Sequence, residues 1–182
     1  MGADKALVKL AGRTLLQHVV DRVGEACSQT VVVAAAEQTL PALPSRVHVI
    51  CDDVPDAGPL AGLLTAMRWL QQQATAVSCL WLTGCDTPLV DGGVILRVAS
   101  RLAEADAVAI ASEGHTNPLL AVYRLSLLAD LESRFAQGER SLSRCLRQWG
   151  HTVRAADVAS DSQLVNVNTP KALARAAELI GP

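Results

Sequence analysis

The first part of the chain alternates between stretches of helical and of extended hydrophobic spacing. Between residues 15 and 27, apolar side chains recur every three or four positions with polar ones between them, which predicts an amphipathic helix. Continuous β-branched and apolar runs at residues 30–36 and 47–50 have the length of strands that are buried on both faces. Each of these strand runs ends in a polar turn.

The same alternation continues to the end of the chain. We expect helices at residues 60–73, 92–105, 126–136 and 141–148 and after Pro170, and strands at residues 77–83, 107–111, 119–123 and 164–167. Strands that alternate with helices form a mostly parallel sheet covered by helices on both faces. The pattern therefore predicts an α/β protein, and we expect residues 1–182 to form a single domain.

Composition narrows the class of partner. The chain has 182 residues, a formal net charge of -2 and only 3 Trp, 1 Tyr and 1 Phe. With Lys and Arg scattered along its length, we expect no basic surface for nucleic acid or an anionic membrane and no stacking platform for single-stranded nucleic acid. Its 5 cysteines, at irregular spacings, are typical of free thiols in a reducing cytoplasm. No apolar run reaches the length of about 18 residues that spans a bilayer, so we expect a soluble, cytoplasmic protein that binds small molecules.

Candidate chemistry lies directly after the predicted strands. In an open α/β sheet, ligands bind at the carboxyl ends of the strands, and polar groups stand there at residues 51–53, 84–88 and 166–170. Asp86 follows an apolar run, where a carboxylate is well placed to hold Mg²⁺ together with nucleotide phosphates. A turn or a helix cap explains an aspartate at this position equally well. Asp52 is followed by Asp53. Two adjacent acids in a loop are most simply explained as solvent-exposed residues without a binding role.

Three asparagines are further candidates. Asn166 and Asn168 alternate with apolar Val165 and Val167, so both amides are expected on one face of the segment, where they need hydrogen-bond partners. A cap on the following helix explains Asn168 but leaves Asn166 unexplained. Asn117 stands before a proline and is a turn signal first and a site candidate second.

The sequence lacks the signature motifs of several enzyme classes. The 4 histidines have no ligand spacing to one another or to the cysteines. No Ser-His-Asp arrangement can be defended, and neither GxGxxG nor GxxxxGK[ST] is present. A nicotinamide dehydrogenase or a P-loop enzyme is therefore not expected.

Short motifs along essentially the whole chain resemble the molybdenum cofactor guanylyltransferase family. They are Met1-Gly2 with Asp4-Lys5-Ala6-Leu7, Gly12-Arg13-Thr14-Leu15-Leu16, Gly58-Pro59-Leu60-Ala61-Gly62, Cys85-Asp86-Thr87-Pro88, Asn117-Pro118, Gly138-Glu139-Arg140 and Val165-Asn166-Val167-Asn168-Thr169-Pro170. The glycine-rich motif at residues 58–62 recurs in related nucleotidyltransferases, but its combination with the last motif is fairly specific. The resemblance implies a Rossmann-like, three-layer nucleotidyltransferase fold, that of the MobA-like NTP transferases.

The resemblance also implies a reaction and its residues. A terminal phosphate of molybdopterin attacks the α-phosphate of GTP, and pyrophosphate leaves, with Mg²⁺ as cofactor. The implied roles are catalysis and phosphate contact for Lys5, catalysis and Mg²⁺ binding for Asp86, nucleotide binding for Asp52, and acceptor binding for Asn117, Asn166 and Asn168. The implied partners are GTP, molybdopterin and the molybdoenzymes or cofactor-biosynthesis proteins that handle the product.

Two departures from the family pattern leave alternatives open. The family carries a strand and a glycine-rich loop ahead of the motif that contains Lys5, so we expect that Met1 is an internal methionine and that the natural protein begins upstream. Residues 34–36 are alanines where the family often carries an Asn, which leaves GTP and CTP as alternatives. A cytidylyl- or sugar-phosphate nucleotidyltransferase of the same fold is a second hypothesis, and a nonenzymatic binding or regulatory module is a third.

Overall fold

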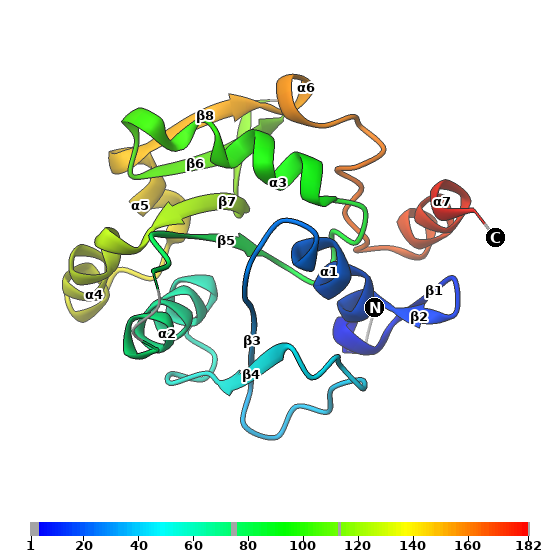
Figure 1. Ribbon diagram of the computed structural model, residues 1–182, viewed down its shortest axis with the longest axis horizontal. Coiled ribbons are helices and arrows are strands. Elements are labelled where there is room, and N and C mark those ends of the chain that lie inside the picture. The colour runs from blue at the N-terminus through cyan, green and yellow to red at the C-terminus, as the bar shows by residue number, and fades with distance from the viewer. Residues whose placement is uncertain (1–3, 74–75, 113, 182) are drawn as a thin grey trace.

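A computed structural model describes residues 4–73, 76–112 and 114–181 (Figure 1). The strands are β1 (Lys9–Leu10), β2 (Arg13–Thr14), β3 (Thr30–Ala34), β4 (Val47–Cys51), β5 (Cys79–Thr83), β6 (Ala107–Ser112), β7 (His115–Arg124) and β8 (Gly150–Arg154). The helices are α1 (Leu15–Gly24), α2 (Pro59–Gln72), α3 (Gly92–Ala99), α4 (Leu128–Ala136), α5 (Leu142–Trp149), α6 (Ala155–Val158) and α7 (Pro170–Ile180), with 3₁₀ turns at Lys5–Leu7, Leu102–Glu104 and Leu125–Leu127. The α/β class is confirmed.

The strands form a four-stranded sheet and two separate pairs, one of which is the short β1–β2 hairpin. The larger sheet has the order β5-β7-β6-β8, and β3 pairs with β4 in parallel. Strands β6 and β8 are parallel, but β7 runs antiparallel to both of its neighbours. The sheet departs there from the mostly parallel arrangement expected, because β7 begins at His115, directly after β6 ends at Ser112. A parallel pairing needs a crossover of a dozen or more residues, so two strands joined this closely pair antiparallel.

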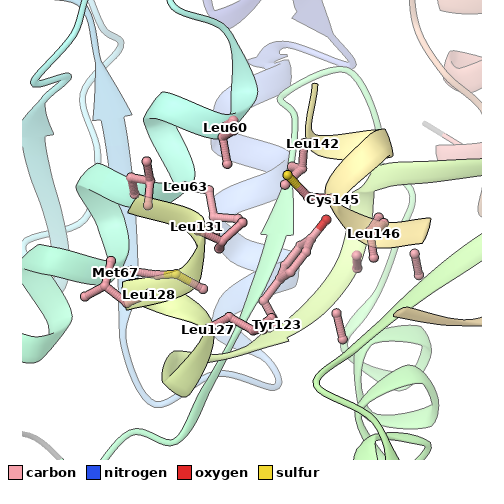
Figure 2. Close-up of a cluster of buried hydrophobic side chains, with 14 residues drawn as sticks. Leu60, Leu63, Met67, Tyr123, Leu127, Leu128, Leu131, Leu142, Cys145 and Leu146 are labelled. Carbon is pink, nitrogen blue, oxygen red and sulfur yellow. The ribbon is translucent and has the colours of Figure 1, made fainter. Parts of the chain in front are cut away.

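Helices cover both faces of the four-stranded sheet, as expected. On β6, Ala107 and Ala109 pack against α2, α4 and α5, whereas Val108 and Ile110 face α3 and α6. Figure 2 shows Tyr123 of β7 among the leucines of α2, α4 and α5. Its buried hydroxyl donates a hydrogen bond of 2.8 Å to a backbone carbonyl of its own strand, so the ring is buried without an unpaired polar group. Alternating side chains thus supply two cores, one on each side of the sheet.

The expected strand at residues 164–167 is wrong. Leu164 lies in a turn, and residues 165–168 form an irregular segment before α7. Val165 and Val167 are buried beside Leu10, and the N–H of Val167 donates to the carbonyl of Asp86 at 2.7 Å. The alternation of apolar and polar residues reflects packing under α7 rather than pairing in a sheet.

Several other elements differ from the pattern. The helix expected at residues 92–105 ends at Ala99 and is followed by a separate 3₁₀ turn, whereas β8, the short helix α6 and the β1–β2 hairpin were not predicted. Two-residue strands are too short for a periodic signal, and β8 follows α5 without a turn motif between them. Within the three described ranges, no helix is long and apolar enough to cross a membrane.

The turn between α4 and α5 is built around the carboxylate of Glu139. Its oxygens accept hydrogen bonds of 2.8 Å from two nitrogens of the Arg144 guanidinium and shorter bonds from the backbone N–H groups of Arg140 and Ser141. The Arg144 hydrogen bonds, followed by that from Ser141, lower the pKa of Glu139 to about 2. The ionised carboxylate is therefore part of the folded turn.

We expect Glu139→Gln to destabilise the protein at neutral pH but not at strongly acidic pH. Since the folded pKa lies below the unfolded one, the stabilisation is present above the ordinary glutamate pKa of about 4.3 and is lost as the pH falls toward 2. Urea unfolding at a series of pH values should show a lower midpoint for the variant at pH 7 and a difference that shrinks between pH 5 and pH 2.5. Glu37→Gln, at an exposed position, serves as the control. A constant difference across this range would contradict the assignment.

Candidate active site

Lys5 and Asp86 meet beyond the carboxyl end of β5. The Lys5 Nζ lies 3.0 Å from Asp86 Oδ2, and the two side chains are 39% and 19% exposed. The same ammonium donates a hydrogen bond to Asn168 Oδ1. The fold thus brings together three of the predicted site residues from distant parts of the sequence, as a cation held between a carboxylate and an amide.

The loop after β5 leaves room for the Asp86 carboxylate. A Cβ added to Gly84 would lie 2.8 Å from Asp86 Oδ1, closer than such atoms approach. Glycine at this position therefore provides the space that the carboxylate occupies. The backbone carbonyl of Asp86 is bonded to the N–H of Val167, which ties this loop to the segment that carries Asn168.

Lys5 is held in place by residues to which the sequence assigned no role. The preceding Asp4 accepts a hydrogen bond of 2.9 Å from the N–H of Ala6 and one of 2.8 Å from the side-chain amide of Gln38. Gln38 in turn bonds the backbone of Ala35, just beyond β3. An aspartate ahead of a helical turn is a common capping residue, so the cap formed by Asp4 could have been predicted from the sequence. Its contact with Gln38 could not, because the two residues are 34 positions apart and share no local pattern.

The two asparagines before α7 differ in what they contact. Both are exposed while Val165 and Val167 between them are buried, so the expected alternation of exposure is present. Asn168 contacts Lys5 through its side chain, and its backbone N–H bonds the carbonyl of Asn166 at 3.0 Å. The cap of α7 is Thr169 rather than Asn168. The helix-cap explanation of Asn168 is therefore wrong.

Asp52 and Asn117 lie on two other segments, outside this cluster. Asp52 follows β4, and its carboxylate accepts hydrogen bonds of 3.2 Å from the N–H of Val54 and 3.3 Å from the hydroxyl of Thr65 in α2. Asn117 lies in β7 and accepts a hydrogen bond of 3.0 Å from the N–H of Leu119. Among the described residues, no hydrogen bond or ion pair joins either side chain to the Lys5–Asp86 pair, so the structure does not bring these two predicted residues into direct contact with it.

The side chains at the site fit a metal ion that is shared with a phosphorylated substrate. No group of three or more His, Cys, Asp and Glu side chains that could hold a metal occurs in the described part of the chain. Asp86 supplies one hard oxygen donor, partly exposed and next to a cation that attracts phosphate. Mg²⁺ is commonly bound in this way, by one or two carboxylates with substrate phosphates and water completing its shell.

Cys85, next to Asp86, is not suited to act as a nucleophile. Burial raises the pKa of the Cys85 thiol, and the negative charge of Asp86 raises it further. The thiolate, which is the reactive form of cysteine, is therefore disfavoured at neutral pH. The chemistry of this site is consequently that of charge and alignment rather than of a covalent cysteine intermediate.

Two solved structures share the fold of this chain. Molybdopterin-guanine dinucleotide biosynthesis protein A from Archaeoglobus fulgidus superimposes with a TM-score of 0.76 at 24% identity, over 98% of this chain and 91% of that protein. 2-C-methyl-D-erythritol 4-phosphate cytidylyltransferase from Thermus thermophilus gives a TM-score of 0.70 at 16% identity, over 98% and 94% of the two chains. At these identities the likeness bears on the fold, and it confirms the nucleotidyltransferase architecture.

Relatives of known family resemble the chain over nearly its full length. A molybdenum cofactor guanylyltransferase from Sinorhizobium fredii (strain NBRC 101917 / NGR234) is 34% identical over 98% of this chain and 85% of the relative. A probable molybdenum cofactor guanylyltransferase from Mycobacterium bovis (strain BCG / Pasteur 1173P2) is 33% identical over 95% and 85%. The model of the MobA-like NTP transferase domain matches residues 1–158. With this match and the geometry of its site, the chain belongs to the family of MobA-like NTP transferase domains.

Proposed function

We propose that this protein transfers GMP from GTP to the phosphate of molybdopterin and releases pyrophosphate. The observation that carries the proposal is the cluster of Lys5, Asp86 and Asn168 beyond the carboxyl end of β5. A cation, a carboxylate and an exposed amide at this edge are the groups that phosphoryl transfer needs. The relatives named molybdenum cofactor guanylyltransferases support the choice of nucleotide and acceptor.

The reaction is a direct displacement at phosphorus. An oxygen of the acceptor phosphate forms a bond to the α-phosphorus of GTP, while the bond from that phosphorus to the bridging oxygen of the β-phosphate breaks. The electron pair leaves with pyrophosphate. Negative charge accumulates on the phosphate oxygens as this happens, and the Lys5 ammonium is placed to neutralise it.

Asp86 holds Mg²⁺ in this proposal, and the ion neutralises and orients the nucleotide phosphates when bound. The ion pair with Lys5 keeps the carboxylate aimed at the position where the phosphates would lie. Asn168 accepts a second hydrogen bond from the same ammonium, which restrains the position of the Lys5 side chain. The three side chains therefore form one positioned unit.

We assign roles to the remaining candidate residues from their positions relative to the cluster of Lys5, Asp86 and Asn168. We assign Asn166 and Asn168 to the acceptor because both amides are exposed next to the cluster, and Asn117 because β7 begins beside the end of β5. Asp52 is assigned to the nucleotide because β3 and β4 are parallel, so that the carboxyl end of β4 lies at the same edge as that of β3. We place the reaction in the cytoplasm, consistent with free cysteines.

Calorimetric titration with GTP, CTP and ATP, each with Mg²⁺, tests the nucleotide, and release of pyrophosphate in the presence of molybdopterin tests the transfer. We expect GTP to bind more tightly than the other two and pyrophosphate release to require molybdopterin. A clear preference for CTP would instead favour a cytidylyltransferase, because that class shares the fold. A folded protein that binds no nucleotide would contradict the proposal and favour a nonenzymatic module.

A further inference from the structure

The loop of residues 52–58 runs from β4 into α2 (Figure 1) and is also attached to the middle of that helix. Thr65 and Arg68 lie three positions apart in α2 and therefore on the same face of the helix. Their side chains bond Asp52 and Asp53 at the start of the loop. The loop is thus held by side chains of the helix and not only at its two ends.

The hydroxyl of Thr65 connects α2 to both acids of the loop. Thr65 is 4% exposed and stands between Leu64 and Ala66, which are buried as well. Its hydroxyl accepts a hydrogen bond of 3.2 Å from the N–H of Asp53 and donates one of 3.3 Å to Asp52 Oδ1. A buried hydroxyl without partners costs free energy, and here both partners belong to the loop. The polar side chain in this apolar part of α2 is therefore explained by the loop that it holds.

The carboxylate of Asp52 is held through one of its two oxygens. Oδ1 accepts the hydrogen bonds from the Thr65 hydroxyl and from the N–H of Val54. The backbone N–H of Asp52 donates to the carbonyl of Ala34, at the end of β3, at 2.8 Å. In the described parts of the chain, no hydrogen bond or ion pair involves Oδ2, and the residue is half-buried. One oxygen thus sets the orientation of the carboxylate and leaves the other to a ligand.

Arg68 connects the same loop to α4. Its Nε lies 2.6 Å from Glu132 Oε1 in α4, and its Nη1 lies 3.1 Å from Asp53 Oδ2. The three side chains are between 35% and 51% exposed, so their ion pairs contribute little to stability. The planar guanidinium nevertheless fixes the angle between its two partners. Asp53, and with it the start of the loop, is therefore restrained relative to α4.

We infer that Thr65, supported by Arg68, is a positioning residue that holds the Asp52 carboxylate in the orientation in which it binds the nucleotide. The inference rests on the proposed function, in which Asp52 contacts the nucleotide. Loops are mobile, and a group that has to be ordered during binding reduces the affinity for the ligand. The Thr65 hydroxyl orders the carboxylate in the free protein, so GTP binds without that cost.

Positioning of this kind acts on binding rather than on the chemical step. In the proposed function, Lys5 and Asp86 meet the charge that develops during transfer, whereas Asp52 contacts the nucleotide throughout. Loss of the Thr65 hydroxyl therefore weakens an interaction that is equally strong in the ground state and in the transition state. Such a loss raises KM and leaves kcat unchanged, whereas a general disturbance of the site lowers kcat as well.

The test replaces Thr65 by Val, which has nearly the shape of threonine but no hydroxyl. We expect the calorimetric Kd for GTP with Mg²⁺, and the KM for GTP in pyrophosphate release, to rise about tenfold, the usual loss of one hydrogen bond to a charged group, with kcat within about twofold of the parent. Thr65→Ser keeps the hydroxyl and should bind GTP as the parent does. Thr30→Val, the same replacement at a buried threonine at the start of β3, should leave the Kd unchanged.

Two further variants show whether the effect passes through Asp52. In an Asp52→Ala background, Thr65→Val should cost no further affinity, because the carboxylate that it positions is gone. Arg68→Met, at a partly exposed position, should raise the Kd by about threefold. Parent-like GTP affinity in either Thr65→Val or Arg68→Met, once its unfolding midpoint shows it to be folded, would overturn this inference alone, as would a loss that persists in the Asp52→Ala background. A parent protein that binds no GTP would overturn the proposed function and the inference with it.

Discussion

Replacing Asp86 by Asn is expected to lower kcat/KM for Mg²⁺-dependent nucleotidyl transfer by about 10²- to 10³-fold, the usual effect of removing one preorganised group that stabilises charge in a transition state. Asn has the shape of Asp, so it fits the space above Gly84 and retains the backbone bond to Val167. What the variant loses is the negative charge that pairs with Lys5 and that we propose binds the metal ion. We therefore expect loss of turnover without loss of the fold.

The metal dependence separates this role from a purely structural one. If Asp86 holds Mg²⁺, the variant should need a higher Mg²⁺ concentration for half-maximal turnover and should recover in part as the concentration is raised. Asp130→Asn is a suitable control, since it removes the same charge from an exposed ion pair on α4. Full turnover of the Asp86 variant at the parent's Mg²⁺ concentration would rule out the assignment.

The sequence predicted the elements with long hydrophobic patterns well. Helices α1 and α2 and strands β3 to β7 appear within a few residues of the predicted ranges, because each has a long apolar pattern. Burial on both faces was wrong for β4, whose residues are half-buried or exposed. The antiparallel direction of β7 follows from its short connection to β6, a local signal that the expectation of a mostly parallel sheet did not take into account. At residues 164–167 the alternating pattern predicted a strand that the structure does not have. The alternation arises there because Val165 and Val167 pack under α7.

The site residues, too, were predictable only where the local sequence carries a signal. Asp86 was found because it follows a strand, and its contact with Lys5 is consistent with the rule that strand ends gather ligands. The supporting contact between Asp4 and Gln38 could not be found, because it joins a turn to a loop through two side chains with no shared motif. Asp52 shows the limit of the rule: it follows a strand, yet its carboxylate bonds Thr65 of α2.

Replacing Lys5 by Met is expected to lower kcat/KM by about 10²-fold, because it removes the positive charge that lies 3.0 Å from the Asp86 carboxylate. Methionine keeps an unbranched chain of similar length, and a partly exposed ion pair contributes at most about 1 kcal/mol, so the protein should remain folded. Nucleotide affinity should fall together with kcat, since the ammonium attracts the phosphates in the ground state and attracts them more strongly in the transition state, where negative charge accumulates.

A double variant tests whether Lys5 and Asp86 act as one unit. If they do, Lys5→Met combined with Asp86→Asn should lose little more activity than the more damaging single variant, because groups that act together are strongly non-additive. Lys9→Met, at an exposed lysine of β1, controls for the lost charge. Losses that multiply in the double variant would mean that the two side chains act independently, and that their ion pair in the free protein is not the arrangement in which they meet the substrate.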